Sequence, residues 1–225
     1  MTLYLSRLTL NGEASARSLM PLLNPDDPAM AASAHHRLIW HVFSDSHARK
    51  RDFLWRHDGK GRFMTLSTRP PAGSGLFLPP ETKAFEPQLR PGDRLRYVLR
   101  ANATRTRRVD QGRGQRVDVV MDLLHEVPAG KGRAEARPRL AAEAANAWMK
   151  AQGLGKGYKP LSTVTEGYAT LELGRNRREG ATFGILDLSG EIEITDPAAF
   201  LPALAQGFGR AKAWGCGLML IRRAR

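Results

Sequence analysis

The feature that most limits the folds open to this sequence is the order of its apolar patterns. The same succession of strand and helix patterns occurs twice along the chain. The stretch 2–10 alternates apolar and polar residues, which predicts a half-buried strand. Asp27-Pro28 predicts a helix start, since the Asp27 side chain can accept from free backbone N–H groups and proline suits the first turn. In chain order, the first half is predicted to contain a strand at 2–10, a helix at 29–43, strands at 53–57 and 63–67, a short helix at 82–88 and a strand at 94–102.

The second half repeats this order. It is predicted to contain a strand at 117–127, a helix at 139–152, strands at 161–173 and 182–194, a short helix at 197–206 and a strand at 218–223. Two β-α-β-β-α-β units predict an α+β fold of two tandem ferredoxin-like domains, an architecture that is also RRM-like. We expect an N-terminal domain at 1–103, a basic linker at 104–116 and a C-terminal domain at 117–225.

Positive charge exceeds negative charge by a wide margin. Lys and Arg number 35 against 22 for Asp and Glu, a formal net charge of +13. Such an excess indicates a polyanionic partner, most often nucleic acid, since Lys and Arg neutralise phosphates and release counterions. A general preference for arginine is the alternative, but the basic residues are clustered at 49–51, 105–116 and 175–178. The clustering favours a surface that binds nucleic acid.

Several other classes of protein are excluded by composition. Cys216 is the single cysteine, so neither an internal disulfide nor a zinc site built from several cysteines can form. No apolar run approaches the ~18 residues of a membrane span, and 1–11 resembles a strand rather than a signal peptide. We therefore expect a cytoplasmic protein that does not contact a membrane, with Cys216 as a small packed residue rather than a nucleophile.

The predicted helix at 29–43 carries a polar face that could perform chemistry. Four side chains spaced i, i+3, i+4 and i+7 share this face: Ser33, His36, Arg37 and Trp40. A histidine exchanges protons near neutral pH, and an adjacent arginine can stabilise the charge that develops on a phosphorane. RNA supplies its own nucleophile, the 2′-OH. One alternative is a solvent-exposed helix with incidental histidines; another is a metal site, for which His36 lacks partners at ligand spacing.

A glycine-rich stretch at 207–217 follows the last predicted helix. Its glycines let backbone N–H groups approach a phosphate, and Arg210 and Lys212 add positive charge. A dinucleotide fingerprint requires a strand before the loop and a helix after it, and no Gly-Lys-Ser/Thr occurs, so we expect no nucleotide cofactor. The alternative for this stretch is a helix cap followed by tight turns.

Two further clusters are candidates for nucleic-acid contacts. Arg175, Arg177 and Arg178 lie at the tip of a predicted β-hairpin, where they would suit a groove or a phosphate backbone. The predicted linker contributes Arg105, Arg107 and Arg108. The alternative for the hairpin tip is a solvated turn.

Taken together, these motifs resemble those of CasE, the repeat-RNA endoribonuclease of type I-E CRISPR systems. The resemblance covers nearly the whole chain. It rests on the N-terminal MTLYLSR, on His36-Arg37, on the stretches 51–55 and 90–102, and most of all on GFGRAKAWGCGL at 207–218. Each motif alone is weak evidence for this family, but the presence of all of them in this order is specific to it.

The resemblance implies metal-independent cleavage of CRISPR precursor RNA within the repeat, just 3′ of its stem-loop. Attack by the 2′-OH would leave a 2′,3′-cyclic phosphate and a 5′-OH, with no cofactor. It also implies that the protein, a monomer on its own, stays bound to the crRNA hairpin and joins the other subunits of Cascade. His36 falls on the family's catalytic histidine, Arg37 on an active-site arginine and His41 on a basic position. The cluster at 175–178 falls on a hairpin that enters the RNA major groove.

One position departs from the family pattern. Relatives carry a tyrosine one turn before the catalytic histidine, where this sequence has Ser33. A serine hydroxyl is shorter and less acidic, so His36 would work mainly with Arg37 and the hydroxyl of the substrate. His35 is a further candidate for this role. This departure motivates the alternative function, a non-catalytic subunit of the same complex that binds structured RNA.

Overall fold

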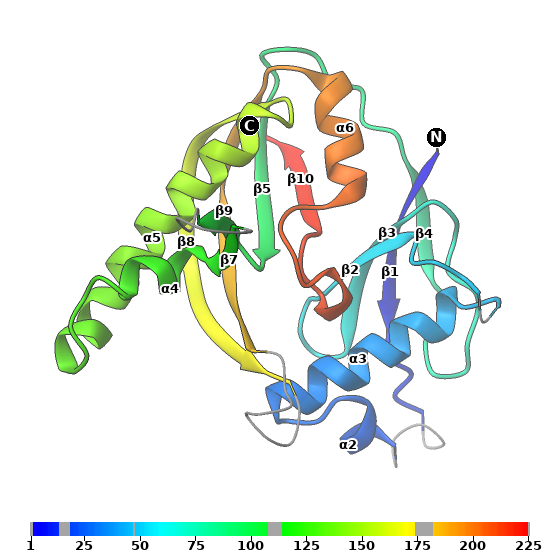
Figure 1. The fold of residues 1–225 in the computed structure, drawn as a ribbon. Helices are drawn as coiled ribbons and strands as arrows, with labels where there is room; N and C mark the ends of the chain where they lie inside the picture. The colour runs from blue at the N-terminus through cyan, green and yellow to red at the C-terminus, as the bar shows by residue number, and fades with distance from the viewer. Residues whose placement is uncertain (1, 14–18, 47, 108–113, 174–181, 225) are drawn as a thin grey trace.

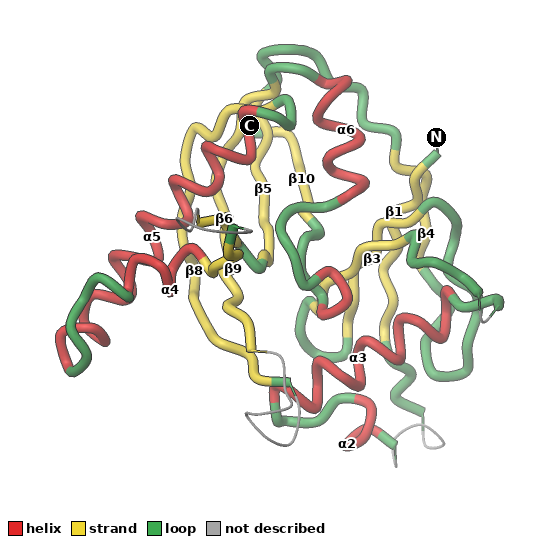
Figure 2. The backbone as a smooth tube through the Cα atoms, in the orientation of Figure 1, coloured by secondary structure: helices red, strands yellow, loops and turns green. Residues whose placement is uncertain are grey.

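The computed structural model of the 225-residue chain describes residues 2–13, 19–46, 48–107, 114–173 and 182–224. Two four-stranded antiparallel sheets form the framework, and a two-stranded ribbon is attached to the second (Figure 2). The predicted α+β class with two ferredoxin-like units is confirmed, because both sheets have the strand order of that fold.

The first sheet has the order β2-β3-β1-β4. Its strands are β1 (Leu3–Thr9), β2 (Phe53–His57), β3 (Arg62–Ser67) and β4 (Glu81–Phe85). A short helix, α2 (Met20–Leu23), precedes α3 (Pro28–Phe43). The Asp27 side chain accepts from Met30 N at 2.7 Å, so the predicted helix start is confirmed. The apolar side of α3 packs on this sheet through Leu38, Ile39 and Val42, with the buried aromatic rings of the strands beneath them.

The predicted helix at 82–88 is wrong, because this segment forms the edge strand β4. Its residues are mostly exposed, and its register with β1 places Glu81 opposite Arg7 and Thr82 opposite Ser6. Arg7 donates to the Glu81 carboxylate, and Thr82 Oγ1 donates to Ser6 Oγ at 3.0 Å. Pairing with the open edge of β1 therefore overrides the local preference of this polar segment.

The second sheet has the order β10-β5-β9-β8. Its strands are β5 (Arg94–Ala101), β8 (Tyr158–Glu172), β9 (Thr182–Ile194) and β10 (Met219–Arg223). Two helices, α5 (Lys131–Leu154) and α6 (Pro197–Gln206), cover its core face. The strand predicted at 94–102 exists, but it pairs with β9 and β10 and does not close the first sheet. The first sheet ends with β4 instead, and the boundary at 103 stays a prediction.

The region between β5 and α5 also differs from the prediction. The expected linker at 104–116 contains two strands, β6 (Thr104–Arg107) and the start of β7 (Gln115–Asp118), which pair with each other. The expected strand at 117–127 is mostly a helix, α4 (Val119–Leu124). Its valines suit a strand, but the Asp118 side chain accepts from Val120 N and Met121 N and so begins a helix.

The two halves meet along their apolar faces and through the glycine-rich stretch. Leu54 and Leu66 of the first sheet join the larger core of the second half. After α6, the orange-red loop in Figure 1 reaches α3, and its single 3-10 turn, η1 (Lys212–Trp214), contacts that helix. The polar face of α3 is thereby placed next to the C-terminal half of the chain.

Candidate active site

The polar face of α3 presents the predicted residues on successive turns. Arg37 and His41 are exposed, whereas Ser33 and His36 are half-buried. Arg37 Nε donates to the backbone carbonyl of Ser33 at 3.3 Å. The rest of the Arg37 guanidinium thus faces solvent one residue from His36, where it could reach a phosphate group.

His36 is oriented by a residue that sequence analysis did not identify. Its Nδ1 lies 2.8 Å from the carbonyl oxygen of Ala213 in η1. A carbonyl only accepts, so the Nδ1 atom carries the proton, and in the neutral ring Nε2 is left as the acceptor. The Trp214 ring packs on the His36 ring at a centroid distance of 5.1 Å and an angle of 35°. This arrangement fixes both the tautomer and the direction of the free nitrogen.

The backbone of the glycine-rich stretch explains how η1 reaches His36. Ala211 has φ 50 and Gly215 has φ 75, so left-handed residues stand on both sides of the turn. A Cβ atom on Gly215 would lie 3.1 Å from the Trp55 ring. The predicted alternative, a helix cap with tight turns, is also present, because Gly207 ends α6 with φ 79. The motif therefore acts as a cap and as a support for His36.

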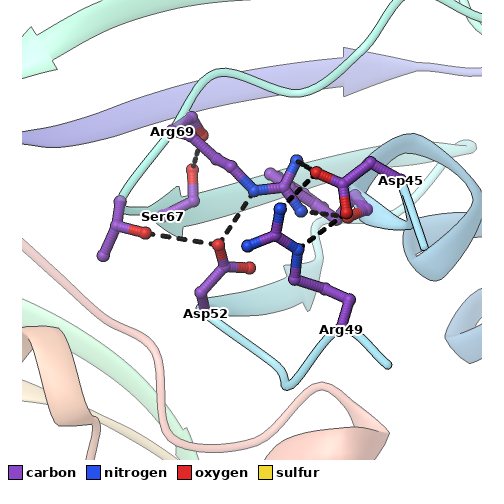
Figure 3. A network of polar contacts seen from close by, with 7 residues as sticks. Asp45, Arg49, Asp52, Ser67 and Arg69 are labelled. Atoms are coloured by element: carbon purple, nitrogen blue, oxygen red, sulfur yellow. Dashed lines mark hydrogen bonds and ion pairs between the residues drawn. The ribbon is translucent and has the colours of Figure 1, made fainter. Parts of the chain in front are cut away.

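The C-terminal end of α3 is held by a polar network centred on Arg69 (Figure 3). Arg69 donates to the Asp52 carboxylate at 2.9 Å and to the Phe43 carbonyl, and Asp45 pairs with both Arg69 and Arg49. The network anchors the last turn of the helix to β2 and β3. Arg49, from one of the basic clusters, is thus already neutralised by Asp45.

A second group of cations surrounds a pocket of about 330 Å³ beside the glycine-rich stretch. Arg116, Lys156, Arg210 and Lys212 all line it, and no carboxylate is among its described lining residues. No ion pair joins these four side chains to a carboxylate in the described ranges. Burial lowers the pKa of Lys156, and the charge of Lys212 lowers it further. The predicted pair Arg210 and Lys212 is therefore part of a larger cluster, and Lys156 is a member that sequence analysis missed.

Arg105 also lines this pocket, but Arg105 and Arg107 differ from the four cations above in having a carboxylate partner. Both pair with Asp122 of α4, whose side chain is only 4% exposed, whereas the two arginines are 54% and 63% exposed. The Arg107 contact measures 3.5 Å. These arginines attach the β6–β7 ribbon to α4, and their outer N–H groups still face solvent.

Arg108, Arg175, Arg177 and Arg178 lie outside the described residues. Cys216 is fully buried, and burial raises the pKa of its thiol to about 12, consistent with a packed residue. Within the described ranges, no group of three metal-ligating side chains could hold a metal ion. No described helix is both long enough and apolar enough to span a membrane.

Comparisons with known proteins identify the family of this chain. A family model described as "CRISPR associated protein" matches residues 3–223. The CRISPR system Cascade subunit CasE of Escherichia coli (strain K12) is 27% identical over 197 residues, covering 83% of this chain and 89% of that protein. A structure of CRISPR endoribonuclease Cse3 bound to a 19 nt RNA has a TM-score of 0.65 and 25% identity, covering 98% of this chain and 99% of that one.

A further structure shares the fold alone. The CRISPR-associated protein Cas6e from Escherichia coli str. K-12 has a TM-score of 0.61 at 22% identity, covering 98% of this chain and 100% of that one. The resemblance inferred from the sequence motifs is confirmed by the family match across nearly the whole chain: this chain belongs to the CRISPR-associated protein family, as a relative of the CasE proteins.

Proposed function

We propose that this chain is an endoribonuclease that cleaves CRISPR precursor RNA within the repeat, just 3′ of its stem-loop. It then stays on the crRNA hairpin as a subunit of Cascade. The observation that carries the proposal is the hydrogen bond between His36 Nδ1 and the Ala213 carbonyl, which leaves His36 Nε2 available for proton transfer. The likeness to an RNA-bound endoribonuclease at 25% identity and to a Cascade subunit supports it.

The proposed reaction needs only groups of the RNA and of this chain. The 2′-oxygen attacks the adjacent phosphorus, the bond to the 5′-oxygen breaks, and a 2′,3′-cyclic phosphate and a 5′-OH result. The 2′-OH gives up a proton, and the leaving 5′-oxygen gains one. His36 acts in one of these transfers, as acid or base, and Arg37 stabilises the added negative charge on the phosphorane. Ser33 lies one turn away and contributes a weaker polar group.

The proposed RNA surface extends from α3 along the glycine-rich stretch. His41 lies one turn beyond Arg37, and Lys212 lies next to Ala213, whose carbonyl holds His36. Arg210, Lys156 and Arg116 continue the positive surface toward the ribbon that carries Arg105 and Arg107. Arg108 and the cluster Arg175, Arg177 and Arg178 complete the proposed contacts, and Arg175→Ala should weaken hairpin binding.

The test is to incubate the purified protein with a cognate repeat RNA and to look for a shorter product. His36→Ala should lower the cleavage rate by about 10²–10⁴-fold, because general acid–base groups typically contribute that much. Hairpin affinity should stay within a few-fold of wild type, and EDTA should change nothing. Cleavage by His36→Ala at the wild-type rate would contradict the assignment of His36, and loss of activity in EDTA would indicate a metal.

A non-catalytic RNA-binding subunit is the second candidate, favoured by the serine at position 33. The same incubation separates the two. Tight binding of the repeat hairpin without any product, under conditions in which the RNA is intact and folded, would favour the binding subunit.

A further inference from the structure

A second, smaller pocket lies between α3, β2 and the glycine-rich stretch. Its volume is about 220 Å³. Ala31 and Ala32 of α3 form one wall, Trp55 and His57 of β2 form another, and Trp214 belongs to its lining. Arg100 is the single charged side chain among its described lining residues. The Arg100 charge is already neutralised by Asp187, to which Arg100 donates two hydrogen bonds of 2.8 Å.

The lining suits a planar, uncharged group rather than a phosphate. Two indole and two imidazole rings line it together with aliphatic side chains, and the His35 ring is neutral at pH 7 because burial lowers its pKa to about 4. A phosphate would need free cations or a row of backbone N–H groups. Pockets of this kind, apolar and aromatic with a few polar atoms, are typical of sites that hold an extruded nucleobase.

Two polar atoms of the lining residues lack a partner. His57 Nε2 and Trp55 Nε1 are both buried and form no hydrogen bond with any described residue. Trp55 itself is only 2% exposed. Buried polar groups are normally satisfied, so both residues keep an unused capacity for hydrogen bonding beside the pocket, which the edge of a base could reach only if these side chains shifted. His57 is also held away from the charged form, since burial and the charge of Arg100 lower its pKa.

The pocket is adjacent to His36. Trp214 lines the pocket and also packs on the His36 ring. Ala32 precedes His36 by one helical turn. A base in this pocket would therefore contact the same indole ring as the proposed general acid or base.

From this geometry we propose that the pocket binds the base of the first nucleotide on the 3′ side of the scissile phosphate. The proposal rests on the proposed function, in which the cut lies just 3′ of the stem. The base on the 5′ side is then paired within the stem, whereas the base on the 3′ side is unpaired and free to turn outward. Turning it out also breaks the stacked helical geometry, which lets the 2′-oxygen, the phosphorus and the 5′-oxygen approach a line.

The test uses single-turnover cleavage of a repeat RNA and of the same RNA with an abasic site at that nucleotide. The abasic RNA should be cut at least about fivefold more slowly, since stacking of one base on aromatic side chains contributes at least that much. Ala32→Leu fills the pocket and should slow cleavage of the normal RNA to a similar extent. The two changes together should slow it no more than either alone. Ala29→Leu, on the same helix but outside the pocket lining, is the matched control and should cut normally.

A fluorescence measurement makes the result independent of activity and of the folding of Ala32→Leu. 2-Aminopurine at the same nucleotide should change in fluorescence when the RNA binds the His36→Ala protein, because the base moves next to aromatic rings. Equal cleavage of normal and abasic RNA, or no fluorescence change on binding, would overturn the base pocket while leaving the endoribonuclease intact. Absence of cleavage of every RNA would instead contradict the proposed function.

Discussion

His36 Nδ1 lies 2.8 Å from the carbonyl oxygen of Ala213, 177 positions away in the sequence. The bond joins the helix that covers the first sheet to the loop that leads into the last strand of the second. Because the acceptor is a backbone atom, its position depends on the left-handed residues around η1. The proposed catalytic group is therefore oriented only when the two halves of the chain are docked.

This bond predicts the tautomer of His36. In the free protein, the nitrogen NMR shifts of the neutral ring should show the proton on Nδ1. Trp214→Ala removes the ring that packs on His36, so a mixture of tautomers should appear and the cleavage rate should fall by up to about 10²-fold. The rate should be measured on RNA with the abasic site, so that the loss reports on His36 alone.

Trp214→Phe is the control for this prediction. It keeps an aromatic ring against His36 and should retain most of the rate and the Nδ1–H form. Hairpin affinity should be within a few-fold of wild type in both variants. A wild-type spectrum showing the proton on Nε2 would contradict the geometry of the site.

Asp122 should stabilise the fold rather than take part in binding. Its buried carboxylate is shared by Arg105 and Arg107, so Asp122→Asn leaves two guanidinium groups without their charge partner. We expect the free energy of unfolding to fall by about 1–3 kcal/mol, measured by denaturant titration. Glu143→Gln is a matched change in the exposed pair with Arg139, and it should cost less than about 0.5 kcal/mol. Equal losses in the free energy of unfolding for the two variants would show that the burial of Asp122 adds nothing to the stability of the fold.

The sequence predicted those elements whose signals are local. Asp27-Pro28 identified the start of α3, alternation identified β1, and two strand segments on either side of a basic turn identified the β8–β9 pair. The prediction of secondary structure failed at 82–88, where pairing with the free edge of β1 decides the structure. It also failed at 117–127, where the helix cap formed by Asp118 outweighs the strand preference of the valines. The sheet to which β5 belongs was also missed, because its partners lie more than 80 residues away and no local pattern encodes such pairing.

The site could be predicted to a similar extent. Helical spacing is sufficient to bring Ser33, His36 and Arg37 onto one face. The Ala213 carbonyl could not be identified, because sequence patterns specify side chains and not the position of a backbone oxygen. Lys156 was overlooked within a run of glycines that was interpreted only as the end of a helix, although it lines the same pocket as Arg210.

The cations around the larger pocket should dominate the salt dependence of RNA binding. Lys156→Ala and Lys212→Ala should each reduce the slope of log K against log salt by about 0.7–0.9, as expected for one lost phosphate contact. Arg107→Ala should have a smaller effect, because Asp122 already offsets part of its charge. Lys150→Ala, an exposed lysine of α5 outside the pocket, is the control. If all four variants change the slope equally, the pocket is not a preferred position for the RNA backbone.

His35 should make the protein less stable in mild acid. Burial, and then the nearby His57, lower the pKa of its ring from 6.5 to about 4. Between these two values the unfolded chain binds a proton that the folded chain does not, so the free energy of unfolding falls as pH falls through this window. Below pH 4 this contribution levels off. The lowered pKa of His57 acts in the same direction.

Denaturant titrations between pH 7 and pH 4 test this behaviour. In the wild type His35 Nε2 lies 3.0 Å from Asn24 Oδ1, and His35→Gln keeps an N–H group that can donate to the same oxygen without titrating. The variant should lose less stability than the wild type over the same pH range, because the one proton taken up by His35 in the unfolded chain is gone. The carboxylates that also titrate near pH 4 are common to both proteins and cancel in the difference. Parallel stability curves for the two proteins would show that His35 is protonated equally in the folded and unfolded states, contrary to its burial among Trp55, His57 and Phe63.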